Sequence, residues 1–278
     1  MPSEPSAPLP PIRLVRQTGS TNDDVAEMGR SGAPHGSAVA ARAQTAGRGR
    51  RGHVWESPEG GLYLSVLLRP EVPMQQLMGI AAVGAMGALD ALRSLGAERV
   101  ALKWPNDVVA GPEPGAGKVA GVLAEAGYGD GGTFAVFGIG VNLSRGGIGD
   151  LAGCGTARPL EPACLEDAMR GGTAAPGLED LAEAIRDAVV ERCDGWSAEV
   201  RAGHAAAGPL APILSEYFDR MPLLGRQVMA VLPDGRVACR GVFAGVDVWG
   251  RATVHLADGS DVEFASEQAS LRELQGPA

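Results

Sequence analysis

The sequence contains very little lysine and asparagine for its length. Among 278 residues, of which 24 are basic, only Lys103 and Lys118 are lysines, and only Asn22, Asn106 and Asn142 are asparagines. A coding bias toward Arg, Ala, Gly and Pro accounts for this scarcity. The bias does not account for where these residues are kept, so their positions are the first candidates for function.

The chain also lacks paired cysteines, long apolar runs and a positive net charge. Its four cysteines (154, 164, 193 and 239) form no C-x-x-C pair and have no histidine at zinc spacing, so no common zinc site is expected. Without a signal-like N-terminus, this pattern predicts a reduced cytoplasmic protein. Runs such as 62–68 are too short to cross a bilayer, so no membrane partner is expected. The net charge of −9 argues against a general nucleic-acid binder.

The composition and the periodicity divide the chain into three parts. Residues 1–11 hold five prolines and are expected to be a disordered tail. Residues 12–220 carry most of the apolar patterns and form the predicted main domain. Residues 221–278 contain four segments that alternate or run apolar, at 227–232, 236–246, 251–256 and 261–264, with turns at 233–235 and 258–259. These segments are predicted strands of a small antiparallel barrel.

Within the main domain, the patterns predict strands alternating with amphipathic helices. The predicted strands are 12–17, 37–43, 62–68, 100–103, 108–110, 119–124 and 133–141, and the predicted helices follow Ser20 and cover 75–95, the stretch after 178, and 210–220. Ser20 or Thr21 is expected to cap the first helix through its hydroxyl oxygen. Residues 145–177 are expected to be rich in loops.

The sharpest local signal is the loop 44–52, which reads QTAGRGRRG. Arg48, Arg50 and Arg51 repel one another unless an anion is present, and guanidinium groups bind phosphates and carboxylates in a bidentate manner. The glycines between them allow a ligand to approach the backbone closely. The alternative is an ordinary exposed basic loop.

Both lysines lie at ends of predicted strands. Lys103 ends one strand, and Asn106 and Asp107 follow in the turn KWPND; Lys118 begins the strand KVAGVL. A further strand, 137–142 (FGIGVN), contains glycines that imply close contact with another group. The third glycine of a dinucleotide fingerprint is missing from it, and residues 112–119 depart from a P-loop. Trp55 is interpreted as a core residue or as a cover over a planar ligand.

Taken in order, these segments resemble the bacterial biotin protein ligases, in the form without an N-terminal DNA-binding domain. The resemblance rests on STN at 20–22, QxxGRGRRG at 44–52, Trp55, KWPND at 103–107, and KxxGxL and GIGVN at 118–123 and 138–142. It covers about residues 18–143. It implies an α+β fold: a catalytic domain like that of class II aminoacyl-tRNA synthetases, with a mixed, mainly antiparallel sheet flanked by helices, and a C-terminal SH3-like β-barrel.

The resemblance also implies a two-step ligation. The biotin carboxylate attacks the α-phosphate of MgATP to give biotinyl-5′-AMP and pyrophosphate, and a lysine of a biotin carboxyl carrier domain then displaces AMP. The implied partners are biotin, ATP with Mg²⁺, and the carrier domain of a biotin-dependent carboxylase such as acetyl-CoA carboxylase. Only 19 residues precede Ser20, so no DNA partner is expected. Pairing into a homodimer is left open.

The resemblance assigns roles residue by residue. Catalysis falls to Lys118, Arg48 and Arg50; biotin binding falls to Ser20, Thr21, Asn22, Gln44, Arg48, Gly49, Arg50, Lys118 and Gly121; ATP binding falls to Arg51, Gly52, Trp55, Lys103, Asn106 and Asn142. The metal ion is expected to arrive with the ATP phosphates, with Asp107 or Asn142 as candidate direct ligands.

Two alternatives remain at this point. A lipoate protein ligase would share the fold and the adenylate chemistry, although GRGRRG and KWPND are closer to the biotin branch. A non-catalytic sensor would hold biotinyl-adenylate without transferring it.

Overall fold

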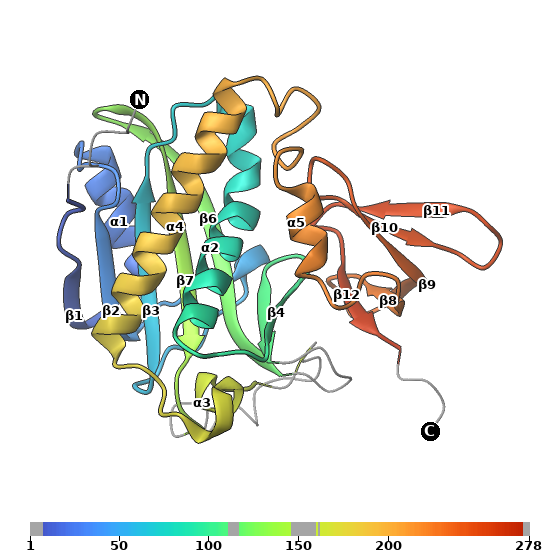
Figure 1. The fold of residues 1–278 in the computed structure, drawn as a ribbon, viewed down its shortest axis with the longest axis horizontal. Helices are drawn as coiled ribbons and strands as arrows, with labels where there is room; N and C mark the ends of the chain where they lie inside the picture. Colours follow the sequence, from blue (N-terminus) through green and yellow to red (C-terminus); the bar gives the residue numbers. More distant parts are fainter. Residues whose placement is uncertain (1–7, 111–116, 146–159, 161, 275–278) are drawn as a thin grey trace.

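The computed structural model describes residues 8–110, 117–145, 160 and 162–274. Most of the predicted Pro-rich tail, the hairpin tip after Ala110 and Cys154 lie outside these residues. In the described part of the chain, seven strands form one sheet in the order β1-β2-β3-β7-β6-β5-β4. The sheet spans the main body, as Figure 1 shows.

The strands of this sheet agree closely with the predicted ones. They are β1 (Arg13–Thr18), β2 (Ala38–Gln44), β3 (Gly61–Leu68), β4 (Val100–Lys103), β5 (Asp107–Ala110), β6 (Lys118–Gly129) and β7 (Gly132–Asn142). β1 pairs parallel with β2, whereas the other neighbours pair antiparallel. The expected mixed, mainly antiparallel sheet is therefore confirmed.

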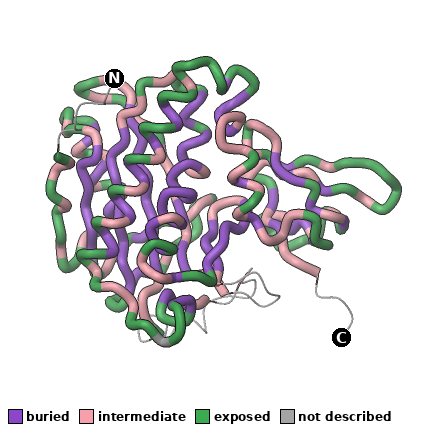
Figure 2. The backbone as a smooth tube through the Cα atoms, in the orientation of Figure 1, coloured by how far each residue is buried: buried purple, intermediate pink, exposed green. Residues whose placement is uncertain are grey.

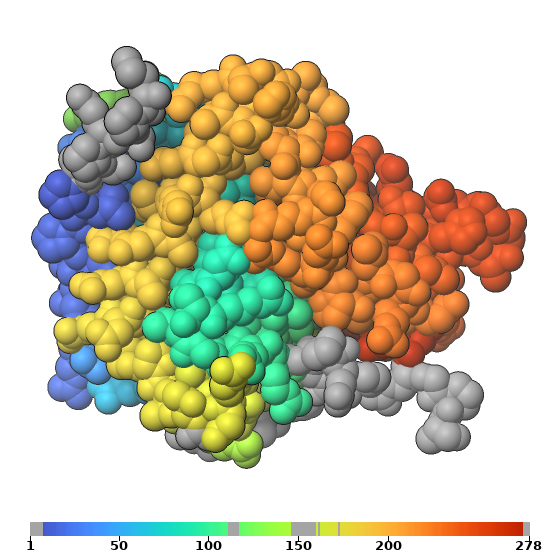
Figure 3. Space-filling view, viewed as in Figure 1, coloured from blue at the N-terminus to red at the C-terminus, as the bar shows by residue number. Residues whose placement is uncertain are grey.

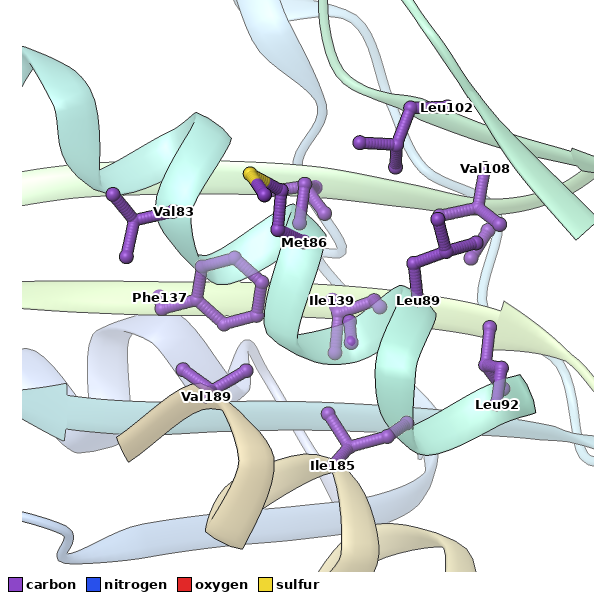
Figure 4. Packing of buried hydrophobic residues seen from close by; sticks show 14 of the residues in the cluster. Val83, Met86, Leu89, Leu92, Leu102, Val108, Phe137, Ile139, Ile185 and Val189 are labelled. Atoms are coloured by element: carbon purple, nitrogen blue, oxygen red, sulfur yellow. The ribbon is translucent and has the colours of Figure 1, made fainter. Parts of the chain in front are cut away.

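Helices cover both faces of the sheet. On one face lie α2 (Ile80–Ser94) and α4 (Leu178–Arg201), which pack against each other and against the central strands, as the close view of Figure 4 shows. On the other face lies α1 (Thr21–Arg30), whose Val25 joins a small cluster with Val39 and Phe134. Successive strand residues point to opposite faces of the sheet. Val39 therefore packs in the cluster under α1, whereas Ala38 and Ala40 pack in the larger cluster on the face of α2 and α4. The purple strands of Figure 2 show how fully this layer is buried.

One stretch, Met74–Ser94, is long and apolar enough to cross a membrane by length and composition. It consists of a 3₁₀ turn at Met74–Gly79 followed by α2. However, 67% of its most apolar window is buried inside the protein, and Ile80, Met86 and Leu89 are almost inaccessible. It is the core helix of the body, which places its apolar side chains on the sheet.

The C-terminal part forms a separate antiparallel sheet in the order β11-β10-β9-β8-β12. Its strands are β8 (Gln227–Val231), β9 (Val237–Val246), β10 (Ala252–His255), β11 (Asp261–Phe264) and β12 (Ser270–Glu273), and α5 (Leu214–Asp219) precedes them. Four of the strands match the predicted ones; β12 was not predicted. The space-filling view shows this sheet projecting from the body (Figure 3).

Two hydrogen bonds tie the sheet edge of the body to the end of the segment that leads into the C-terminal sheet and to that sheet's own β9–β10 turn. The Leu102 amide donates to the Arg220 carbonyl over 2.9 Å, and the Trp104 indole donates to the Gly250 carbonyl over 2.9 Å. Both donors lie at the end of β4, directly before the turn that carries Asn106 and Asp107. The C-terminal sheet is thereby held beside the predicted site. Residues 165–168 form a short helix, α3 (Leu165–Ala168), inside the expected loop region.

Candidate functional site

A cavity of about 650 Å³ lies where the body meets the C-terminal sheet. This volume falls in the range that holds small-molecule ligands. The ends of several strands and the start of α1 bring side chains together around it. From the predicted set, it is lined by Ser20, Thr21, Asn22, Gln44, Arg48, Gly49, Arg50, Arg51, Trp55, Lys103, Asn106, Asp107, Lys118, Gly121 and Asn142. Gly52 is the predicted site residue that does not line it.

One end of the cavity is built from neutral polar groups in fixed orientations. The Thr21 amide donates to Gln44 Oε1 over 2.8 Å, and Gln44 Nε2 donates to Ser57 Oγ over 3.0 Å. A backbone N–H can only donate, so it fixes which end of the Gln44 amide faces α1. The Ser20 hydroxyl makes no capping bond to the helix, so the predicted cap is wrong in this detail. The Ser20 side chain is buried beside the cavity instead.

Asn22 lies across the strand β7 at this same end. Its Oδ1 accepts from Ser65 Oγ on β3 over 2.6 Å, and its Nδ2 donates to Glu125 Oε2 on β6 over 2.7 Å. A Cβ atom on Gly138, between these two partners, would lie 2.0 Å from Asn22 Oδ1. The glycine of the GIGVN segment is therefore required by close contact with Asn22.

The opposite end carries both lysines of the chain. Lys118 Nζ lies 2.6 Å from Asp107 Oδ1, and Lys103 Nζ lies 3.8 Å from Asp107 Oδ2. Lys103 is only 5% exposed, and its burial lowers its pKa, an effect that Asp107 partly opposes. Two cations share one carboxylate, so this end has an excess positive charge suited to an anionic ligand.

Trp55 covers the strand backbone next to Lys118. Lys118 Nζ lies 4.8 Å from the centre of the indole ring, a distance typical of cation–π attraction. Added Cβ atoms at Gly121 and Gly140 would lie 2.9 Å and 2.4 Å from the ring. The two glycines pair across β6 and β7 and make the flat surface on which the indole lies.

The three arginines of the loop all have acceptors within the protein. Arg48 contacts Asp23 over 2.8 Å and Glu125 over 2.9 Å. Arg50 donates to Asn106 Oδ1 over 3.1 Å and to the Ser266 carbonyl. Arg51 donates to the carbonyls of Ser266 and Ala269, the latter over 2.7 Å. The prediction that these charges need a bound anion is therefore too strong. Carboxylates neutralise Arg48, and backbone carbonyls of the C-terminal part accept hydrogen bonds from Arg50 and Arg51.

Two predicted ligand contacts also serve the fold. Asn142 Nδ2 donates to the carbonyls of Lys118 and Ala163, each over 3.1 Å, so it ties the start of β6 to the segment before α3. Asn106 Nδ2 donates to the Val122 carbonyl over 2.6 Å. Their amide nitrogens are thus engaged in fixing the cavity wall.

A protein-bound metal ion does not fit the predicted ligands. The oxygens of Asp107 face two ammonium groups, so Asp107 is unsuited to bind a cation. Asn142 uses its amide nitrogen on two carbonyls, so it could contribute a single ligand at most, through Oδ1. Among the described residues, no cluster of three or more His, Cys, Asp or Glu side chains could hold a metal.

Several residues at the site were not predicted. Ser65 could have been noticed because it is the polar residue in the otherwise apolar strand GLYLSVLL. Glu125 and the turn at 266–269 carry no local signal. Arg272 on β12 lines the cavity, and its buried Nε has no hydrogen-bond partner among the described residues. Arg272 adds positive charge near Lys103 and lowers the pKa of that lysine further.

The chain is similar to known proteins in its sequence and in its overall fold. Residues 14–142 match the model of the "Biotin/lipoate A/B protein ligase family". The chain is 32% identical to a biotin–[acetyl-CoA-carboxylase] ligase of Paracoccus denitrificans over 91% of this chain and 98% of that protein. It is 29% identical to the Mycobacterium tuberculosis protein of that name over 94% of this chain and 89% of the other. A biotin protein ligase from Aquifex aeolicus, solved with biotin and ATP, superposes with a TM-score of 0.70 at 22% identity, over 95% of this chain and 99% of that one.

Proposed function

The chain belongs to the biotin/lipoate A/B protein ligase family, and we propose that its cavity is where biotin is activated with ATP and passed to a carrier protein. It is a ligase. In the first step, a biotin carboxylate oxygen bonds to the α-phosphorus of ATP as the bond to pyrophosphate breaks. In the second step, a carrier lysine amine attacks the acyl carbon, loses a proton, and AMP leaves with the anhydride electrons.

The observation that carries this function is the polarity of the cavity. A neutral end with fixed amides, around Thr21, Asn22 and Gln44, matches the ureido ring of biotin, because a neutral polar group needs matched donors and acceptors. A cationic end, around Lys103, Lys118 and Arg272, matches the phosphates of ATP. Both ends lie in one cavity, so a carboxylate held between them would face the α-phosphate.

We propose that biotin is bound by the neutral end, by residues 48–50 of the arginine loop, and by Lys118 and Gly121 beside its carboxylate, and that Arg51 and the rest of the cationic end bind ATP. The first set is Ser20, Thr21, Asn22, Gln44, Arg48, Gly49, Arg50, Lys118 and Gly121; the second is Arg51, Trp55, Lys103, Asn106 and Asn142, to which Arg272 is added. Gly52 is retained only as a backbone position of the loop. Mg²⁺ enters with the ATP phosphates as part of the substrate.

Lys118 is proposed as the main electrostatic catalyst, with Arg48 and Arg50. The reaction needs no covalent nucleophile from the enzyme, because positioning and neutralisation of the phosphate charge lower the barrier. Lys118 Nζ, held by Asp107 and Trp55, occupies a defined place rather than moving freely. Such a preorganised cation stabilises charge that builds up on the α-phosphate without reorganising at the moment of reaction.

Two assays test the two steps: release of pyrophosphate measures adenylate formation, and biotin labelling of a carrier domain measures the transfer. The wild-type chain is expected to release pyrophosphate from ATP with biotin, and to label a biotin carboxyl carrier domain. Activity with lipoate in place of biotin would favour the lipoate branch of the family, and adenylate formation without transfer would indicate a sensor.

Substituting Lys118 tests its role directly. We expect Lys118→Ala to lower the rate of pyrophosphate release by about 100-fold or more, as removal of one preorganised charge-stabilising donor does in other enzymes. Lys118→Arg keeps the charge in a different shape and is expected to recover part of the rate. The thermal unfolding temperature should change little in either variant, and an unaltered rate in Lys118→Ala would exclude the proposed role.

We further propose that 12–220 is the catalytic domain and 221–278 a small domain whose five strands form an SH3-like barrel. The seven-stranded sheet lies within 13–142 and the five-stranded sheet within 227–273, which supports this division. The carrier is proposed to be the biotin carboxyl carrier domain of a biotin-dependent carboxylase, and the site of action the cytoplasm.

A further inference from the structure

Glu125 is a carboxylate next to the cavity that the proposed roles leave unused. It lies on β6, seven residues after Lys118, and its side chain is 41% exposed. Its Oε2 accepts from Asn22 Nδ2 over 2.7 Å and from Arg48 over 2.9 Å. One oxygen atom therefore connects a residue of the neutral end with the first arginine of the loop.

The two partners of Asn22 are not equivalent. Ser65 carries a hydroxyl, which can donate to an oxygen or accept from an N–H. It would therefore accept either orientation of the Asn22 amide. Glu125 carries an ionised carboxylate, which can only accept, so it requires the Nδ2 end of the amide on its side. Among the described contacts of Asn22, only Glu125 distinguishes the two orientations.

A flipped Asn22 would place Oδ1 against the carboxylate oxygen at hydrogen-bond distance. Two acceptors at that distance, with Asn22 only 6% exposed to water, repel each other and leave the amide oxygen without a donor. Gly138 also confines the amide, because Asn22 Oδ1 lies against the strand backbone there. The backbone at Gly138 thus limits where the Asn22 side chain can lie, and Glu125 sets which end of its amide faces β6.

We propose that Glu125 is a positioning residue for biotin: it fixes the donor and acceptor ends of the Asn22 amide that faces the ureido ring. This inference rests on the proposed function, since it assigns the neutral end of the cavity to biotin. It parallels Gln44, whose orientation is fixed by the Thr21 backbone amide. Each of the two side-chain amides at this end therefore has one neighbour that can act only as a donor or only as an acceptor: the Thr21 backbone N–H for Gln44 and the Glu125 carboxylate for Asn22.

The proposal predicts a difference between two substitutions at one position. Glu125→Leu removes the acceptor and allows the Asn22 amide to flip, so the KM for biotin should rise about tenfold while the KM for ATP changes little. Glu125→Gln can place its amide oxygen where Oε2 now lies and accept from both partners. It should therefore stay within about threefold of the wild type for both substrates.

Asp23→Asn is the matched control. Asp23 is the other carboxylate that pairs with Arg48, over 2.8 Å, and no hydrogen bond joins its side chain to Asn22 among the described residues. If the effect of Glu125→Leu came only from loosening Arg48, Asp23→Asn would raise the KM for biotin to a similar extent. We expect Asp23→Asn to leave it within about twofold of the wild type.

A second readout follows the orientation of the amide itself. 2-Iminobiotin replaces the ureido oxygen, an acceptor, with a nitrogen donor. The wild type should discriminate against it, and Glu125→Leu should reduce this discrimination several-fold, because a freely flipping amide can meet either group. 2-Iminobiotin is a guanidinium cation at neutral pH, so loss of the Glu125 charge alone would weaken its binding more than that of biotin and would increase the discrimination. Unchanged or increased discrimination in Glu125→Leu would therefore contradict the proposal.

The measurements are pyrophosphate-release kinetics for the wild type and the three variants, with circular dichroism to verify folding. Wild-type activity with biotin tests the proposed function by itself. If the wild type is active and Glu125→Leu keeps the KM for biotin and the discrimination ratio of the wild type, Glu125 does not position Asn22. A Glu125→Gln variant as impaired as Glu125→Leu would also overturn the proposal.

Discussion

Replacing Gly138 with alanine tests whether the architecture of the neutral end depends on close contact with Asn22. The new Cβ would lie 2.0 Å from Asn22 Oδ1 and 2.9 Å from its Cγ, so the Asn22 side chain has to move. Moving it breaks the bond from Ser65 and the bond to Glu125. The backbone of Gly138 does not itself require glycine, because its φ angle is not positive.

The magnitude follows from these opposing effects. A neutral hydrogen bond contributes about 1 kcal/mol, and one to a charged group about 1.5–3 kcal/mol. Glycine to alanine in a strand recovers roughly 0.5–1 kcal/mol of backbone entropy. The free energy of unfolding should therefore fall by about 1.5–3.5 kcal/mol. The KM for biotin should rise at least about tenfold, because one polar contact to a buried ligand group is worth about 1.4 kcal/mol or more.

The assays are urea unfolding followed by circular dichroism, and pyrophosphate release at varied biotin concentration. Gly195→Ala is the control: Gly195 lies in α4, and apart from its chain neighbours and the backbone of its own helix, no heavy atom of the described residues lies within 4 Å of an added Cβ. This control should stabilise the protein by roughly 0.5–1 kcal/mol and leave the kinetics unchanged. A Gly138→Ala protein that matches the wild type in both stability and KM for biotin would refute the contact argument.

Two further predictions concern the rest of the molecule. Hydrogen bonds from Arg192, and then from Arg220, lower the pKa of Glu216 from 4.5 to about 2. A lowered folded-state pKa stabilises the protein above about pH 4.5, and this stabilisation is lost as the pH falls toward 2. Because the Glu216 side chain is 42% exposed, we expect its ion pairs to contribute only about 1 kcal/mol to the free energy of unfolding after allowing for solvent screening. Urea unfolding of Glu216→Gln should show this loss of stability near neutral pH and not near pH 2. A loss that does not depend on pH would contradict the ion-pair explanation. In the loop 47–52, residues 48, 51 and 52 are exposed. The backbone of this loop should exchange its hydrogens more slowly when biotin and ATP are added together, because bound ligand would shield it. Equal exchange with and without ligands, measured by mass spectrometry, would place the loop outside the ligand contacts.

Local patterns in the sequence predicted most of the strands and helices, because they report local periodicity. The predicted strand 37–43 and the apolar run 62–68 reappear as β2 and β3, and the predicted helix 75–95 contains α2. The strand β12 was missed because Ser270–Glu273 is short and half-polar. It becomes a strand by pairing with β8, a partner that the local pattern cannot specify.

For the site, too, the sequence shows the residues that lie in short motifs but not their partners from distant parts of the chain. Lysines at strand ends, the arginine loop and the glycines of GIGVN are local features, and the sequence alone was enough to single them out. Their partners were not visible, because the contacts join residues far apart in the chain. Glu125 meets Arg48 from 77 positions away, and the Ser266 carbonyl meets Arg50 from 216 positions away.

The sequence by itself therefore determined which residue types are present for the chemistry: two lysines, three loop arginines and a few amides in short segments of strand and turn. The tertiary structure decided how these groups are oriented and how much charge they carry together. Asn22 on α1 meets Glu125 and Gly138 from two strands of the main sheet, and Arg272 from the C-terminal sheet adds to the excess positive charge of the two lysines. Hydrogen bonding and electrostatics act through space over a few ångströms, and only the register and packing of the sheets bring these distant residues within that range.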